Sequence, residues 1–343
     1  EMQRSLVGSE MCIRDSFMSD ILSLGIRCAR KLLGSKGKII SLKYEGYLDL
    51  KDQDANDYIA KFLCEKTTKG KMISKFGTIE LNNIVACYFK QHRWNLTFLR
   101  DIFNYNAAFD VRREMVYLCK NAGFFPNDVW LGEKYYQRML RDMSEIDVLG
   151  SYIYQEKYVN QFLTGITKRV NLDGYYAPFL WKNPWTRVLE GKRVLVVHPF
   201  VESIRYQYEN NREKIWADPN VLPQFKELVT LKAVQSIADA KEQPFRDWFE
   251  ALEYMESEIS KMDFDIALIG CGAYGMCLAA HVKRMGKTAI HLAGWTQMLF
   301  GVYGKRWVED QPEYAKFINQ FWIRPNENER PKGAEKVEGG CYW

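Results

Sequence analysis

Apolar and polar residues follow two different spacings in the second half of the chain. Continuous apolar, β-branched runs that end in turns occur at KRVLVVHPF, FKELVTLKAVQS, FDIALIGCG and KTAIHLAG. Such runs are typical of strands buried on both faces of a parallel sheet. Apolar residues at helical spacing lie between them, in ESIRYQYENNREKIW, PFRDWFEALEYMESEISKM and AYGMCLAAHVKRMG. This alternation predicts a Rossmann-like α/β region over residues 181–325, with a mostly parallel sheet flanked by helices.

The first half of the chain has a different pattern. Helical spacing dominates residues 18–180, which are rich in aromatic side chains. One strand is predicted from Met72 to Lys75, followed by a turn and by a helix that begins near Glu80. We therefore expect a helical N-terminal part that contains one strand–turn–helix unit. Residues 326–343 are polar and rich in Gly and Pro, so we expect an irregular tail whose CYW segment packs back onto the body.

The beginning of the chain needs separate treatment. SLVGSEMCIRDS, residues 5–16, resembles the translation of a sequencing-library adapter. We therefore expect residues 1–17 to be an artefact or a disordered leader, with the natural start at Met18. The basic segment that follows is weakly amphipathic, which fits a packing helix or a helix lying on a membrane surface.

Composition narrows the function classes. The 343 residues are 47% hydrophobic and carry a formal net charge of +5, as soluble globular proteins do. The charges are well mixed, so a nucleic-acid partner is not predicted, whereas an anionic small substrate or a peripheral membrane contact fits. The eight cysteines form no C-x-x-C pair, which indicates reduced thiols and a cytoplasmic location, with contact at the inner membrane face left open. No apolar run reaches the length of a membrane span.

A glycine-rich turn follows one of the predicted strands. Gly270, Gly272 and Gly275 form a G-x-G-x-x-G pattern that leads into a helix. Backbone N–H groups and the helix dipole at such a turn suit a phosphate. A nicotinamide cofactor also asks for an acidic residue about 20 positions later, where His291 and Gly294 stand instead. The glycines alternatively serve only to pack the strand against the helix.

Other candidates surround this turn. His198 ends a predicted strand and is a candidate general base, poised near neutral pH, or a donor to phosphate. GWTQMLFGVYGKRW has no clean period, so we expect a loop over the site in which Gln297 meets sugar hydroxyls or a base. Trp295 and Trp307 are candidates for stacking on a ring. The helix predicted after His198 carries Ser203, Arg205 and Gln207, which are further candidates for binding a ligand.

Two resemblances add to this interpretation. KFGTIEL is similar to the RFGDGE turn of bacterial GT-D-type glycosyltransferases, which have a Rossmann-like fold and take a sugar from a nucleotide donor. VLVVHPFVESI, FDIALIGCGAYG, GWTQMLFGVYGKRW and EGGCYW resemble a bacterial family of unknown activity found among surface-polysaccharide genes. That second resemblance covers nearly all of residues 70–343.

The resemblance implies a site for a divalent cation. In GT-D enzymes a D-x-E turn holds a metal ion that bridges the donor pyrophosphate. Here Thr78 stands at the Asp position and only Glu80 matches. Mn²⁺ or Mg²⁺ is then either held weakly by Glu80 or absent, because such ions prefer several oxygen ligands. In the second case Arg205, Lys305 and Arg306 replace it as cations.

The sequence thus predicts an enzyme that transfers a sugar from a nucleotide-sugar donor to a glycan or lipid-linked acceptor during bacterial surface polysaccharide biosynthesis. Glu80 or His198 would accept the acceptor proton. The donor site is predicted from Phe76, Gly77, Thr78, Ser203, Arg205, Gln207, Gly270, Gly272, Ala273, Tyr274, Gly294, Gln297, Lys305, Arg306 and Trp307. An NAD(P)-dependent oxidoreductase or sugar-nucleotide modifier and a non-catalytic polysaccharide assembly protein remain as alternatives, and the oligomeric state stays open.

Overall fold

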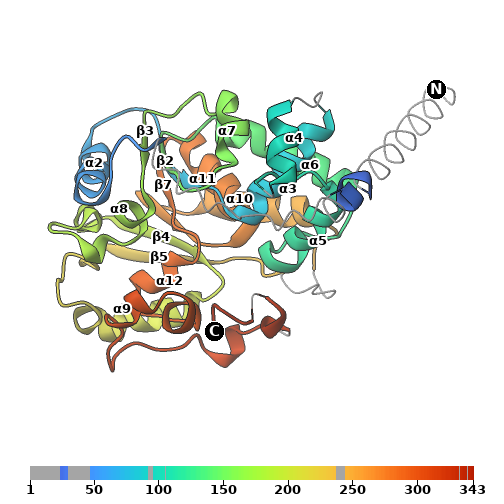
Figure 1. Ribbon diagram of the computed structural model, residues 1–343. Coiled ribbons are helices and arrows are strands. Elements are labelled where there is room, and N and C mark those ends of the chain that lie inside the picture. The colour runs from blue at the N-terminus through green and yellow to red at the C-terminus, as the bar shows by residue number, and fades with distance from the viewer. Residues whose placement is uncertain are drawn as a thin grey trace.

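A parallel β-sheet forms the centre of the molecule. The computed structural model describes residues 24–29, 47–91, 96–104, 106–236, 244–331, 333–337 and 339–343, so the leader expected at residues 1–17 lies outside them. Within these residues seven strands form one sheet in the order β3-β2-β1-β7-β6-β4-β5, and all pairs are parallel (Figure 1). The strands are β1 (Lys71–Lys75), β2 (Val148–Gly150), β3 (Lys168–Val170), β4 (Arg193–His198), β5 (Glu227–Lys232), β6 (Ile266–Ile269) and β7 (Thr288–His291). The predicted Rossmann-like α/β class is confirmed.

Helices cover both faces of this sheet. They are α2 (Asp52–Cys64), α3 (Thr78–Gln91), α4 (Leu96–Phe103), α5 (Val111–Ala122), α6 (Val129–Met143), α7 (Glu156–Val159), α8 (Leu172–Tyr176), α9 (Val201–Ile215), α10 (Trp248–Lys261), α11 (Gly275–Arg284), α12 (Trp295–Leu299) and α13 (Pro312–Ala315). Carboxylates fix several starts: Asp110, Asp128 and Asp247 accept backbone N–H bonds at the first turns of α5, α6 and α10. No helix among the described residues is long and apolar enough to cross a membrane.

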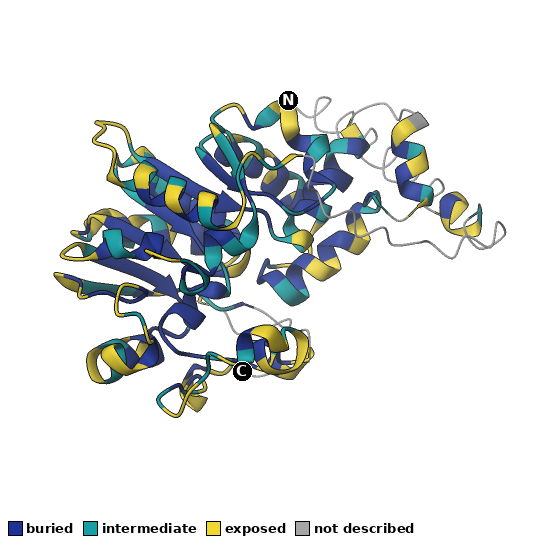
Figure 2. Cartoon of the chain, turned by 60° about the vertical axis from the view of Figure 1, so that its left-hand side comes forward, coloured by how far each residue is buried: buried dark blue, intermediate teal, exposed yellow. Residues whose placement is uncertain are grey.

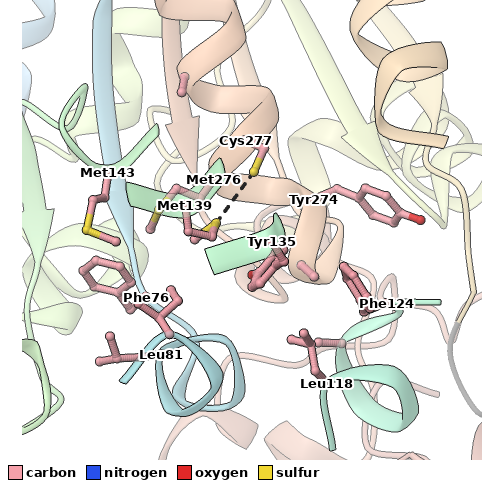
Figure 3. Packing of buried hydrophobic residues seen from close by; sticks show 14 of the residues in the cluster. Phe76, Leu81, Leu118, Phe124, Tyr135, Met139, Met143, Tyr274, Met276 and Cys277 are labelled. Atoms are coloured by element: carbon pink, nitrogen blue, oxygen red, sulfur yellow. Dashed lines mark hydrogen bonds between the residues drawn. The ribbon is translucent and has the colours of Figure 1, made fainter. Parts of the chain in front are cut away.

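Two hydrophobic clusters lie on the two sides of the sheet. The first joins α3, α5, α6, α10 and α11, and Figure 3 shows Cys277 beside Met139, with Phe76 and Tyr135 in the same cluster. The second joins α2, α9 and α12 to the other side of the strands. The strands β1, β2, β4, β6 and β7 are accordingly buried over nearly all of their length, and the edge strands β3 and β5 are only partly buried (Figure 2, buried residues in dark blue). Burial on both faces explains why the sequence reads as continuous apolar runs rather than as alternation.

The first half of the chain is more than a helical region. Its strands β1, β2 and β3 belong to the same sheet as the second half, since Ile73 pairs with both Val148 and Ile290. The sequence pattern predicts β1 but not β2 or β3. Those two strands are three residues long each, which is too short for a period to appear. The pairing of β1 with β7 brings the ends of β1, β7, β6 and β4 to one edge.

The segment expected to be a loop over the site is largely ordered structure. Trp295–Leu299 forms α12, and Arg306–Asp310 forms one π-helical turn. Trp295 stacks on Tyr176 with ring centroids 4.0 Å apart, so packing against the core fixes a segment whose sequence shows no period. The described residues of the tail form short 3₁₀ turns at Glu327–Glu329 and Ala334–Lys336, and Cys341 and Trp343 are buried.

Candidate functional site

A cavity of about 250 Å³ lies at the carboxyl edge of the sheet. It is bounded by residues that follow β1, β4, β6 and β7, by the end of α5 and by residues 342–343. This is where open α/β sheets place their ligands. The predicted site residues that line it are Gly77, Thr78, Glu80, His198, Gly270, Gly272, Tyr274, Gly294, Gln297 and Arg306. Residues far apart in the sequence are therefore brought together as the motifs suggested.

Glu80 lies over the turn that precedes α3. A Cβ atom added at Gly77 would come 1.9 Å from Oε2 of Glu80, so the carboxylate folds back onto the glycine backbone. The first helical bond runs from the N–H of Leu81 to the carbonyl of Gly77, at 2.9 Å. A carboxylate in the first turn suits the helix dipole, and the same position leaves it on the cavity wall.

Lys75 is a cavity residue that the sequence analysis did not select. It ends β1, is only 9% exposed and lines the cavity. Its ammonium contacts the Phe76 carbonyl at 3.4 Å and lies 5.4 Å from the ring centre of Tyr152. It forms no ion pair with a carboxylate in the described part of the chain. The signal was present, because a lysine directly before the FG turn interrupts an otherwise apolar strand end.

His198 is held in one neutral tautomer. The backbone N–H of Phe200 donates to its Nδ1 at 3.0 Å, so Nε2 carries the ring proton. Burial lowers the pKa of His198 to about 3. At neutral pH the ring is therefore neutral and carries its proton on Nε2. Of the two predicted roles, this tautomer favours donation to an anion over that of a general base.

His291 lies beside the glycine-rich turn. Its Nδ1 is 3.1 Å from Oγ of Ser74, and its Nε2 is buried and has no hydrogen-bond partner among the residues that the structure describes. Burial, with a smaller contribution from the nearby charge of Lys75, lowers its pKa to about 3. A Cβ added at Gly275 would lie 2.2 Å from that Nε2, so the ring sits against the first turn of α11.

All three glycines of the G-x-G-x-x-G pattern have packing reasons. A Cβ at Gly270 would lie 2.3 Å from the Ala293 carbonyl oxygen. Gly272 has φ of +56° and approaches the Ala122 carbonyl, while Gly275 makes room for His291. Close approach of β6, β7 and α5 is therefore sufficient to account for the three glycines, as the alternative packing interpretation expects.

Residues 341–343 hold two cavity side chains in place. The backbone of Arg306 donates to the Cys341 carbonyl at 2.9 Å, and its Nη1 donates to the Tyr342 hydroxyl at 3.0 Å. Nε2 of Gln297 donates to the Tyr342 carbonyl at 3.2 Å, while its Oε1 is buried and has no hydrogen-bond partner among the described residues. The predicted contact of Gln297 with sugar hydroxyls or a base stays a prediction.

Seven predicted site residues do not line the cavity. Phe76, Ala273 and Trp307 are buried in the core, so Trp307 is not placed to stack on a ligand there, and Lys305 is exposed. The N–H groups of Glu202 and Ser203 donate to Glu329, which caps α9 in place of a ligand. Arg205 bonds Thr230 on the outer surface. Gln207 donates to the carbonyls of Gly301 and Phe321, both at 2.9 Å.

The cavity residues do not fit a protein-held divalent cation. Glu80 is the only carboxylate that lines it among the described residues, and Thr78 contacts the Tyr152 hydroxyl at 3.5 Å. No group of three His, Cys, Asp or Glu side chains that could hold a metal occurs in the described residues. Lys75 and Arg306 line the same cavity, and their charges oppose a metal and favour an anion.

Comparison with known proteins adds no family assignment. Neither the protein-family models, nor the curated proteins, nor the solved structures contain a match to this chain.

Proposed function

We propose that this protein is a glycosyltransferase that binds the diphosphate of a nucleotide sugar in the cavity at the carboxyl edge of the sheet. The observation that carries the proposal is Lys75, a buried cation that faces the cavity without a carboxylate partner in the described residues. Burying an ammonium group is costly unless something neutralises it. An anionic ligand is the neutralising group that this arrangement lacks.

Further donors support an anionic ligand. The guanidinium of Arg306 lines the cavity and is suited to bidentate binding of phosphate oxygens. His198 contributes a neutral Nε2–H, which donates at neutral pH without any change of protonation. The turn that leads into α11 borders the same cavity and has no side-chain cap. Together these groups present positive charge and N–H donors to one small volume.

The chemical roles follow from the charges. The acceptor hydroxyl oxygen would attack the anomeric carbon while the bond from that carbon to the donor diphosphate breaks. The electron pair leaves with the diphosphate, whose charge Lys75 and Arg306 stabilise. Glu80, the carboxylate on the cavity wall, accepts the hydroxyl proton. In this proposal the protein's own cations do the work that a bridging metal does in GT-D enzymes.

The first experiment is thermal unfolding with a panel of UDP-, GDP-, CMP- and dTDP-sugars and NAD(P), each with and without Mn²⁺. A ligand at 100 times its Kd stabilises the folded state by about 2.7 kcal/mol, which raises the midpoint by a few degrees. We expect one nucleotide-sugar class to raise it, and to do so without Mn²⁺. A shift with NAD(P) alone, or no shift with any nucleotide sugar, would refute the proposal.

A second experiment separates binding from transfer. Glu80→Gln should keep the midpoint shift caused by the donor and abolish sugar transfer. Glu309→Gln is the matched control, because Glu309 is exposed and does not line the cavity. Full transfer by the Glu80 variant would remove the proposed base, and loss of transfer in the Glu309 variant would show an effect unrelated to the cavity.

A further inference from the structure

Residues 339–343 form part of the cavity wall. The carbonyl of Trp343 accepts from the N–H of Lys305 at 3.2 Å and from Nη1 of Arg324 at 2.8 Å. Gly304 allows this approach, since a Cβ there would lie 2.4 Å from the Tyr342 carbonyl carbon. The segment is therefore fixed to the body of the protein, and Tyr342 and Trp343 both line the cavity.

Trp343 has a polar group that nothing satisfies. The side chain is only 8% exposed, and its indole Nε1 is buried with no hydrogen-bond partner among the described residues. Its ring meets Phe200 edge-on, with centroids 5.6 Å apart, and Phe200 in turn contacts the ring of His198 at 5.0 Å. A buried N–H without an acceptor is destabilising, so its retention at a cavity points to a ligand.

The chemistry of the neighbours identifies the kind of acceptor. An indole N–H can only donate. Arg306, which bonds the adjacent Tyr342 hydroxyl, is also only a donor, and His198, which lines the same cavity, carries its proton on Nε2. Three donors line this cavity, and Glu80 at the start of α3 is the one side-chain carboxylate that lines it among the described residues, so the lining favours an oxygen that carries negative charge over a neutral hydroxyl.

We propose that Trp343 is a substrate-positioning residue whose indole N–H donates to a phosphoryl oxygen of the bound diphosphate. This inference rests on the proposed function and adds a binding residue to it. Tyr342 assists by holding Arg306 and Gln297 through its hydroxyl and carbonyl groups. The segment then contributes directly to affinity for the ligand, in addition to closing the fold.

Titration calorimetry with UDP, GDP and inorganic pyrophosphate tests the inference. Trp343→Phe removes the N–H but keeps an aromatic ring, and we expect affinity for the best of these probes to fall roughly tenfold or more. Trp343→His, which restores a ring N–H, should recover part of the loss. Trp307→Phe is the control, because its indole N is likewise buried without a partner in the described part of the chain, and Trp307 does not line the cavity.

The outcomes separate the two proposals. A wild-type protein that binds none of the probes refutes the proposed function and this inference with it. Binding by the wild type together with an equal Kd for Trp343→Phe refutes only the role of Trp343. If that variant does not fold, the indole ¹H–¹⁵N resonance of Trp343 in the wild type tests whether this N–H contacts the bound probe. It should shift on saturation with the probe while that of Trp307 stays, and an unmoved Trp343 resonance overturns the inference.

Discussion

The backbone N–H of Phe200 donates to Nδ1 of His198 across 3.0 Å, two residues apart at the end of β4. This single bond fixes which nitrogen carries the proton and so turns a candidate base into a donor. Because the bond depends on the turn that follows β4, the role of His198 is set by local backbone geometry. The sequence alone shows the histidine at the strand end but not this bond.

Two substitutions of His198 should separate its two hydrogen bonds. His198→Asn keeps an acceptor near Nδ1 and removes the cavity donor, so we expect near-normal stability and weaker binding of nucleoside diphosphates. His198→Gln keeps a donor near Nε2 and leaves the Phe200 N–H without its acceptor, which should cost roughly 1–3 kcal/mol of stability. Urea unfolding measures the stability and calorimetry measures the binding. Lower stability in His198→Asn together with weaker binding in His198→Gln would contradict the assigned tautomer.

The burial of two histidines, His198 and His291, predicts that the folded protein loses stability in acid. His198 and His291 have pKa values lowered by burial to about 3, against 6.5 for the free group. Below pH 6.5 these two histidines become protonated in the unfolded chain but stay neutral in the folded chain. The free energy of unfolding therefore decreases as the pH falls. The loss should approach roughly 1.4 kcal/mol per pH unit for each histidine. Urea unfolding at pH 7.5, 6.5 and 5.5 measures it, and His198→Asn should show a smaller slope. A flat profile would contradict the burial of these rings.

Packing around the glycine-rich turn gives a third prediction. Gly275 begins α11 in helical conformation, where alanine would ordinarily stabilise the helix. Its Cβ would instead lie 2.2 Å from Nε2 of His291, so Gly275→Ala should destabilise by about 2 kcal/mol or more. Gly286→Ala is the comparison, with φ of +79° and no atom within 4 Å, and should cost only about 1 kcal/mol. A Gly275 variant as stable as wild type would argue against the packing explanation.

Residues of α9 should affect stability rather than binding. The Ser203 hydroxyl bonds Glu329 and accepts the N–H of Asn326 at 2.9 Å. Ser203→Ala should lower stability by roughly 1–2 kcal/mol and leave the Kd for nucleoside diphosphates unchanged. Arg205→Ala, on the outer surface, should change neither quantity. Weaker binding in either variant would show that α9 reaches the ligand.

The sequence predicts most of the central sheet and much of the cavity wall for a physical reason. Strands buried on both faces leave apolar runs that can be read directly, and ligand sites form where parallel strands end. The sequence does not predict features that leave no periodic pattern of apolar residues along the chain. Three-residue strands such as β2 have no period, and the burial of Trp307 depends on contacts with distant residues. Trp343 was expected to pack back, but its unpartnered N–H appears only once the tail is placed.

Lys75 gives the last prediction, which concerns stability and binding together. Lys75→Met keeps a long side chain and removes a buried charge that has no carboxylate partner among the described residues, so the ligand-free protein should become more stable by about 1 kcal/mol. Affinity for nucleoside diphosphates should fall at least tenfold in the same variant. Higher stability together with weaker ligand binding is expected when a buried charged side chain serves binding rather than folding.

Lys71 provides the matched control on the same strand. It is also buried, but its ammonium donates to the carbonyls of Phe62, Leu63 and Glu65 at the other end of β1. Lys71→Met should therefore lower stability, because these three carbonyls at the end of α2 lose their donor, and leave ligand affinity unchanged. Thermal unfolding and calorimetry measure the stability and the ligand affinity of both variants, and each of these four results has a stated expectation. If Lys75→Met destabilises the protein and binds as the wild type does, Lys75 is a structural lysine and the anion site must be sought elsewhere.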